Sequence, residues 1–298
     1  MPSFVHPVVC YGETLWTILP TGKQAGGSPV RIACHLQQLG MKPAVVSRIG
    51  YDELGKELIE ALEAKDICTD YFQMDEEKLT GVATAYVRDG YETVYTIYND
   101  AAWDGIECTN ELPGLIAGAG YFVYDSLAAR CRESFHTLLK LLAVAETKVL
   151  HLYLCSPFYN RTLIEDLLLQ ADIVVLTRSE LELITGWFSN YNENAGRIRA
   201  LQEQCNIPVV ALIDNNEEFI LAAGGSLYTC KRFAVQEKDS GISPDAFVAG
   251  LIAKLSAGAG YYEALMYAAA TAIIGHDTKD AFPFYHTKQI DDLLYANR

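Results

Sequence analysis

Residues 238–250 read KDSGISPDAFVAG and are followed by the apolar stretch LIAKLSAGAG at residues 251–260. Turn-forming residues before Asp245, then small and apolar residues at helical spacing, predict a loop that leads into a buried helix. The first backbone N–H groups of a helix have no intrahelical partner, and the helix dipole is positive there. The stretch therefore predicts an anion-binding helix start beside Asp245, a carboxylate that could accept a proton.

The rest of the chain alternates short apolar runs with amphipathic stretches. The predicted strands cover residues 7–11, 44–49, 121–124, 148–154, 172–176 and 208–213, and the predicted helices cover residues 52–64, 133–144, 162–170 and 194–205. This alternation predicts an α/β fold with a parallel sheet covered by helices on both faces. Residues 80–98 instead alternate like a hairpin around Asp89-Gly90, which predicts either a small β lid or an ordinary edge hairpin.

Composition excludes several classes of protein. The net charge of −15 argues against a nucleic-acid partner, because duplex binding needs clustered Lys and Arg. No apolar run is long enough to span a bilayer, and the N-terminus lacks a basic start followed by a long apolar segment, so we expect no membrane partner and a cytoplasmic location. The eight cysteines are scattered singly without a C-x-x-C pair, which favours free thiols in a reducing compartment.

Residues 238–250 resemble the D-T-x-G-A-G-D-A-F-x-x-G signature of the PfkB (ribokinase-like) carbohydrate kinases, in register from Asp239 to Gly250. Residues 11–16 (YGETLW), 25–29 (AGGSP) and 47–55 (SRIGYDELG) are similar to that family's G-E-x-L-x-D, G-G-x-P-x-N and V-G-x-D-x-x-G segments. The resemblance extends over nearly the whole chain and is nearest to the fructokinases. It implies one ribokinase-like domain over residues 1–298: a three-layer αβα sandwich with a mainly parallel central sheet and a small β lid. The lid would come mainly from about residues 80–104 and part of 11–30, and it would often pair two subunits into a homodimer.

By resemblance, the activity is transfer of the ATP γ-phosphate to a sugar hydroxyl, with Mg-ATP as the phosphate donor. Asp245 would be the general base, and the anion hole would be lined by Ile242, Ser243 and Pro244. The sugar-binding positions would be Thr17, Gly26, Gly27 and Arg31, the nucleotide-binding positions Thr177, Asp214, Asp239 and Asp280, and the metal-linked position Glu180.

Several of these positions depart from the family pattern. Thr17 and Arg31 replace the Asp and Asn that contact the sugar, and Pro244 brings no N–H to the anion hole. Loss of one such donor typically costs about 3 kcal/mol of transition-state stabilisation. The strand end at residues 150–156 has lost the family's polar positions, which predicts that it serves packing.

The substitutions leave alternatives open for three residues. Asp245 is either the base or a helix-dipole residue, behind a helix start made by Ser243 and Pro244. Arg31 either pairs with an acidic ligand or points to solvent, and Glu180 either organises Mg²⁺ or caps a helix. The chain is accordingly a sugar kinase, a kinase of a sugar acid, or an inactive paralogue that senses a ligand or binds another protein.

Overall fold

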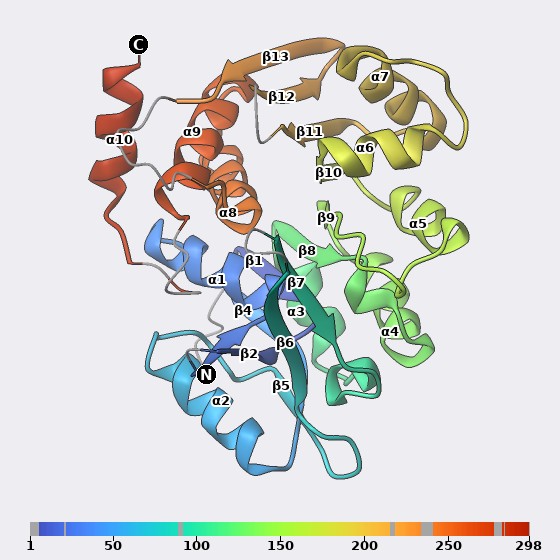
Figure 1. Ribbon diagram of the computed structural model, residues 1–298, viewed down its shortest axis with the longest axis vertical. Coiled ribbons are helices and arrows are strands. Elements are labelled where there is room, and N and C mark those ends of the chain that lie inside the picture. Colours follow the sequence, from blue (N-terminus) through green and yellow to red (C-terminus); the bar gives the residue numbers. More distant parts are fainter. Residues whose placement is uncertain are drawn as a thin grey trace.

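The computed structural model describes residues 6–20, 22–88, 92–214, 218–233, 241–276, 282 and 284–297, with the backbone alone for residues 85–88 and 92–95. A nine-stranded sheet in the order β13-β12-β11-β10-β9-β8-β1-β4-β5 forms its centre (Figure 1). Seven neighbouring strands of this sheet run parallel, namely β11, β10, β9, β8, β1, β4 and β5, and β12 and β13 add an antiparallel edge. The bounds are β1 Val8–Tyr11, β4 Ala44–Gly50, β5 Phe72–Asp75, β8 Tyr121–Asp125, β9 Lys148–His151, β10 Ile173–Thr177, β11 Val209–Ile213, β12 Glu218–Ala223 and β13 Ser226–Lys231.

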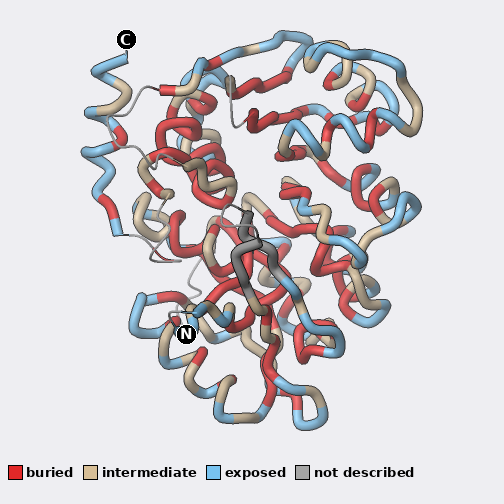
Figure 2. The backbone as a smooth tube through the Cα atoms, viewed as in Figure 1, coloured by how far each residue is buried: buried red, intermediate tan, exposed pale blue. Residues whose placement is uncertain are grey.

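Helices cover both faces of this sheet, because its central strands are apolar on both sides (Figure 2). One hydrophobic core joins the sheet to α1 (Ser28–Gln38), α2 (Glu53–Glu63), α8 (Pro244–Ser256), α9 (Tyr261–Ile274) and α10 (Thr287–Ala296). A second core joins the opposite face to α3 (Leu112–Ala117), α4 (Arg132–Leu142), α5 (Arg161–Leu168), α6 (Arg178–Thr185) and α7 (Asn194–Cys205). The predicted three-layer αβα arrangement is confirmed.

A separate four-stranded sheet has the order β3-β2-β6-β7. It consists of β2 (Leu15–Leu19), β3 (Gly22–Gly26), β6 (Gly81–Arg88) and β7 (Glu92–Ile97). The predicted hairpin is therefore part of a small second sheet and not an edge of the large one. Its predicted turn at Asp89-Gly90 lies outside the described residues.

Two features of the fold differ from the prediction. The strand expected over residues 148–154 ends at His151. The Leu152 N–H still donates to the Val175 carbonyl of β10 (2.9 Å), but the N–H groups of Tyr153 and Leu154 donate to the side chains of Ser126 (3.2 Å) and Glu180 (3.1 Å). The β12–β13 hairpin was not predicted. Its turn is Gly224-Gly225, both with positive φ, which is a typical hairpin connection.

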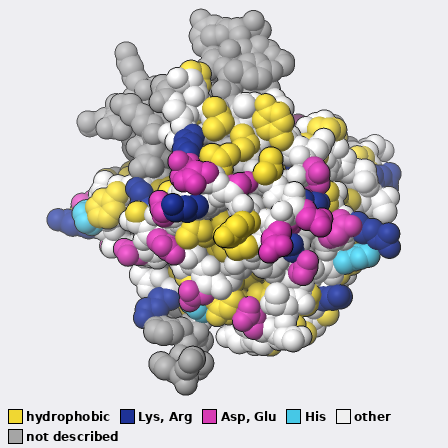
Figure 3. Space-filling model, turned by 90° about the horizontal axis from the view of Figure 1, so that it is seen from below, with side chains coloured by type: hydrophobic (Ala, Val, Ile, Leu, Met, Phe, Trp, Pro, Cys, Tyr) yellow, Lys and Arg dark blue, Asp and Glu magenta, His cyan; other side chains and the backbone are white. Residues whose placement is uncertain are grey.

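All eight cysteines are free thiols, and four of them are buried. Within the described residues, every helix is too short or too polar to cross a bilayer. On the face seen in Figure 3, basic side chains are scattered among acidic ones and form no continuous basic surface.

Candidate active site

The candidate site lies where the carboxyl ends of β1, β8 and β9 meet the N-termini of α1 and α8. These three strands are neighbours in the sheet, with Tyr11 opposite Tyr124 and Asp125 opposite His151. Parallel strands bring their carboxyl ends to one edge, and ligands of open α/β sheets bind at that edge.

The predicted helix start at Asp245 is confirmed. Ser243 is the N-cap of α8, and its Oγ accepts a hydrogen bond from the Ala246 N–H (3.2 Å). Pro244 occupies the first helical turn, where its missing N–H is tolerated. Asp245 follows it and is 6% exposed. Its carboxylate therefore benefits from the helix dipole and also faces the site.

Both oxygens of Asp245 have partners. Arg31 Nε lies 2.6 Å from Oδ2, and Ser28 Oγ lies 2.5 Å from Oδ1. His151 Nδ1 lies 3.5 Å from the same Oδ1. Burial would raise the pKa of Asp245, but the charge of Arg31, the proximity of His151 and the hydrogen bonds from Ser28 and Arg31 outweigh it and lower that pKa. The carboxylate is ionised at neutral pH, as a proton acceptor must be.

Arg31 does not simply point to solvent, because its Nε contacts Asp245, and its expected pairing with an acidic ligand stays a prediction. Its side chain remains 36% exposed, and its Nη atoms have no partner among the described residues. A Cβ atom built on Gly26 would lie 3.7 Å from Arg31 Nη1 and 3.1 Å from Thr17 Oγ1. Three of the predicted sugar-binding residues therefore converge beside the predicted base.

Gly27 joins β3 to α1 with φ of 112°. A Cβ atom there would lie 2.2 Å from the carbonyl oxygen of Glu13, so the chain passes Glu13 at a distance that only glycine permits.

Gly27→Ala is expected to lower the free energy of unfolding by more than about 2 kcal/mol, since it combines an unfavourable φ with a backbone overlap. Gly22→Ala is the matched control: Gly22 also has positive φ (139°), but a Cβ atom there would meet nothing within 4 Å. Urea unfolding of both variants measures the difference. Equal losses would show that the contact with Glu13 relaxes without cost.

Two buried carboxyl groups, Glu13 and Asp125, lie beside this junction. The N–H of Ser28 donates to Glu13 Oε1 (2.8 Å), and the N–H of Ala128 donates to Asp125 Oδ1 (2.7 Å). Their other oxygens, Glu13 Oε2 and Asp125 Oδ2, are buried without a hydrogen-bond partner among the described residues, and each carboxyl group affects the pKa of the other. Burial, followed by the charge of Glu13, raises the pKa of Asp125 well above its ordinary value. Burial also raises the pKa of Glu13, so the folded pair retains a proton to a higher pH than separate carboxyl groups would, and the larger rise at Asp125 favours that residue as its carrier.

This acid pair should make the protein less stable as the pH rises. The folded state holds a proton that an unfolded aspartate loses at about pH 3.9, so the free energy of unfolding falls from there up to the folded pKa of the pair. Asp125→Asn keeps a donor toward Glu13 and removes this loss. Relative to wild type, the variant should gain up to about 1.4 kcal/mol per pH unit within that window in urea unfolding.

Asp52→Asn is the control of opposite sign. Burial would raise the pKa of Asp52, but hydrogen bonds from Thr80 and Gly55 outweigh it and lower that pKa. The stability that ionised Asp52 gives the wild type is lost as the pH falls. The free energy of unfolding of Asp52→Asn should therefore lie below that of wild type at neutral pH and approach it in acid. A difference between wild type and Asp125→Asn that stays constant with pH would contradict the shared proton.

The predicted anion hole offers few backbone donors. The Ser243 N–H donates to the Ala272 carbonyl (2.9 Å), Pro244 has no N–H, and Ile242 packs against the core. Phosphate binding by residues 242–244 stays a prediction.

The predicted metal-linked residue Glu180 and two predicted nucleotide residues, Thr177 and Asp214, lie along the same edge of the sheet. Thr177 and Glu180 form a capping box at the start of α6, and Leu154 N–H donates to the second oxygen of Glu180. The capping role of Glu180 is confirmed. Both of its carboxylate oxygens accept hydrogen bonds, and its metal-linked role stays a prediction. Across the described part of the chain, no group of three or more metal-ligating side chains occurs.

Asp214 follows β11, is 2% exposed and pairs with Arg178 Nη1 (3.2 Å). The other two predicted nucleotide residues, Asp239 and Asp280, lie outside the described residues. Of the four, the structure thus places Thr177 and Asp214 at neighbouring strand ends.

Sequence reasoning missed Ser28, Asp125 and His151. The strand end at residues 150–156 was expected to serve packing, and Leu152 does so at 1% exposure, but His151 enters the polar cluster. The available signal was positional: Asp125 directly follows the apolar run at residues 121–124, and His151 is a single polar residue within the apolar run at residues 149–154, near the edge where parallel strands present ligand-binding groups.

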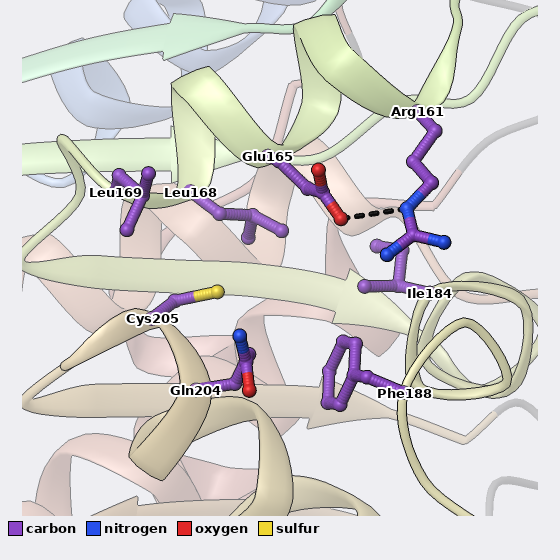
Figure 4. Close-up of a pocket in the computed structure, with 8 residues that line it drawn as sticks. All are labelled: Arg161, Glu165, Leu168, Leu169, Ile184, Phe188, Gln204 and Cys205. Atoms are coloured by element: carbon purple, nitrogen blue, oxygen red, sulfur yellow. Dashed lines mark hydrogen bonds and ion pairs between the residues drawn. The ribbon is translucent and has the colours of Figure 1, made fainter.

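A pocket of about 300 Å³ lies between α5, α6 and α7, on the sheet face opposite α8 (Figure 4). Leu168, Ile184 and Phe188 line it, and Arg161 pairs with Glu165 at its rim (2.7 Å). The residues that line this pocket do not include Asp245 or the residues that converge beside it in the candidate site.

Comparison with known proteins gives consistent results. The family model described as "pfkB family carbohydrate kinase" matches residues 7–278. The chain is 24% identical to a probable fructokinase-7 of Arabidopsis thaliana, over 98% of this chain and 93% of the relative.

Solved structures share the fold. A fructokinase with bound ATP from Xylella fastidiosa matches with a TM-score of 0.86 at 18% identity, covering 98% of this chain and 99% of that one. A putative ribokinase II from E. coli, in complex with ATP and Mg²⁺, matches with a TM-score of 0.82 at 15% identity, covering 97% and 99%. The predicted fold class is confirmed.

Proposed function

Because the chain belongs to the pfkB family of carbohydrate kinases, we propose that it transfers the γ-phosphoryl group of ATP to a hydroxyl group of a small sugar or sugar acid. The observation that carries the proposal is Asp245: an ionised, buried carboxylate in the first turn of α8, beside the converging Thr17, Gly26 and Arg31.

In this reaction the acceptor hydroxyl gives its proton to Asp245 while its oxygen forms a bond to the γ-phosphorus. The bond from that phosphorus to the bridging oxygen breaks, and ADP leaves. The acceptor must first take the place of one present partner of Asp245. Arg31 is the partner best suited to move, since it is partly exposed, whereas Ser28 is 5% exposed.

The acceptor that fits Arg31 best carries an acid group. Its Nη1 and Thr17 Oγ1 both lie near Gly26, where the resemblance places the sugar, and a guanidinium binds carboxylate or phosphate in a two-pronged geometry. An acid group there would draw Arg31 from Asp245 and so free the base. Thr17 supplies one short hydroxyl to the same ligand.

The nucleotide would lie along the ends of β10 and β11, near Thr177 and Asp214, with Asp239 and Asp280 as further contacts. Bound Mg²⁺ would neutralise charge on the phosphates. Glu180 would act on the metal only through intervening waters, because both of its oxygens are engaged at the start of α6. A homodimer formed through the small sheet and a cytoplasmic location also stay predictions.

The test has two steps. Calorimetric titration with Mg-ATP, without and with fructose, is expected to show saturable binding, and a phosphotransfer screen should then yield product, with sugar acids ahead of neutral sugars. Arg31→Met should reverse that order by lowering the rate with acids most. A folded protein that neither binds Mg-ATP nor forms product would overturn the proposal in favour of a ligand-sensing or protein-interaction role, which the comparisons do not support.

A further inference from the structure

His151 is a polar residue in an apolar setting. It ends β9, is 6% exposed, and is flanked in sequence by Leu150 and Leu152, which are 0% and 1% exposed. Burying an imidazole without hydrogen bonds is costly. Its Nδ1 lies 3.0 Å from Ser28 Oγ and 3.5 Å from Asp245 Oδ1, so these three polar atoms form a compact triangle in which Ser28 is the nearer partner of His151.

The protons in this cluster can be counted. Asp245 is ionised and can only accept, so the 2.5 Å contact is a hydrogen bond donated by Ser28 Oγ. A serine hydroxyl has one proton, and Ser28 has thereby used it. The contact with His151 must then run the other way, with the imidazole Nδ1–H as donor and Ser28 Oγ as acceptor.

The proton count also excludes a serine nucleophile. In a Ser-His-Asp triad, the histidine accepts the serine proton at one nitrogen and donates to the aspartate from the other. Here Ser28 and Asp245 both face Nδ1. The cluster instead directs hydrogen bonds toward one carboxylate oxygen.

We propose that His151 is a positioning residue for Asp245: it donates Nδ1–H to Ser28 and so fixes the Ser28 hydroxyl as a donor to Asp245. The orientation of Asp245 is thereby set from two sides, by Arg31 at Oδ2 and by the Ser28–His151 pair at Oδ1. Burial lowers the pKa of His151, against the charge of Asp245, so the imidazole acts as a neutral donor. The role as a positioning residue for catalysis rests on the proposed function, while the hydrogen-bond direction does not.

The charged groups around His151 come from three elements. Asp245 on α8 and Glu180 on α6 favour its protonated form, and Arg31 on α1 opposes it. The two carboxylates do not outweigh the effect of burial, so the pKa of His151 is lowered and its imidazole is neutral. A neutral imidazole carries its hydrogen on either Nδ1 or Nε2, and the proposal requires Nδ1.

The first experiment identifies that tautomer. Long-range ¹H–¹⁵N spectra of the full chain with ¹⁵N-labelled histidine distinguish Nδ1–H from Nε2–H imidazole, and His151→Asn identifies the signal. We expect neutral His151 with the hydrogen on Nδ1 at pH 7. An Nε2–H tautomer or an imidazolium would overturn the proposal. These spectra need no catalysis, so their result is independent of whether phosphotransfer occurs.

The second experiment tests positioning. The carboxyl carbon of Asp245, assigned with Asp245→Asn, is titrated by ¹³C NMR in three variants. His151→Leu removes the donor at similar volume and should shift the Asp245 titration to higher pH, whereas His151→Asn keeps an N–H donor and should restore it. His35→Leu is the control, since His35 is also buried and contacts Tyr285 through Nδ1 (3.0 Å), and it has no hydrogen bond to Asp245 or Ser28 among the described residues.

In the active enzyme, His151→Leu should lower kcat roughly tenfold to a hundredfold, with the KM for ATP unchanged. His151→Asn should recover most of this loss. An unshifted Asp245 titration in His151→Leu, or a kcat equal to wild type, would show that His151 is only a packing residue.

Discussion

Asp245→Asn is expected to lower kcat/KM for phosphotransfer by about a hundredfold to ten-thousandfold, the range contributed by a general base. The amide keeps the shape of the carboxylate and its first-turn position in α8, but it cannot accept the proton of the acceptor hydroxyl. Steady-state kinetics with the best acceptor from the phosphotransfer screen measures the effect, and circular dichroism confirms that the variant is folded.

Glu263→Gln is the matched control. Glu263 is the first-turn acid of α9, the helix that packs on α8, and its carboxylate is 63% exposed and pairs with Lys254. Both substitutions remove a negative charge from a helix start, so any effect of the helix dipole is common to them. A loss of less than tenfold in Asp245→Asn, or equal losses in both variants, would assign Asp245 to helix capping alone.

Asp104→Ala is expected to lower the free energy of unfolding by about 3–5 kcal/mol, because it leaves a buried arginine without its counter-ion. Asp104 is fully buried, and the side chain of Arg130 is 3% exposed. Arg130 Nε and Nη2 contact the two carboxylate oxygens at 2.6 and 2.8 Å. The guanidinium also stacks on Trp103, 3.8 Å from its ring centroid, so it cannot turn to solvent without losing that packing.

Glu165→Ala is the control for this ion pair. Arg161 and Glu165 have the same chemistry at 2.7 Å, but their side chains are 55% and 41% exposed, and such pairs contribute about 0.5 kcal/mol or less. Replacing both Asp104 and Arg130 by apolar residues should recover part of the loss, since no unpaired charge then stays buried. Equal losses in Asp104→Ala and Glu165→Ala would show that water reaches Arg130.

Much of the fold could be predicted because its signals are local. The apolar runs of the parallel strands and the helix start at Ser243-Pro244-Asp245 each depend on neighbouring residues. The β12–β13 hairpin was missed although Gly224-Gly225 marks its turn.

The site was less predictable because its contacts are not local. Ser28 lies 123 residues from His151 and 217 residues from Asp245 along the chain, and no spacing in the sequence shows that their side chains meet. Arg31 was recognised as a substitution, but its pairing with Asp245 depends on the packing of α1 against α8. Asp125 directly follows a predicted strand, and the burial and the neighbouring Glu13 charge that raise its pKa depend on how distant segments pack.

The short connections between the large sheet and the β2–β3 hairpin have a mechanical consequence. Only residues 12–14 separate β1 from β2, and only Gly27 separates β3 from α1. Any rocking of this hairpin against the large sheet must therefore be absorbed by backbone rotation at Glu13, Gly27 and their immediate neighbours. Glu13 is one member of the acid pair, and Ser28, which follows Gly27, donates to the carboxylate of Asp245. The residues that would flex are therefore next in sequence to a residue that contacts the predicted base, so a movement of the small sheet toward the large one would also change the alignment of Asp245.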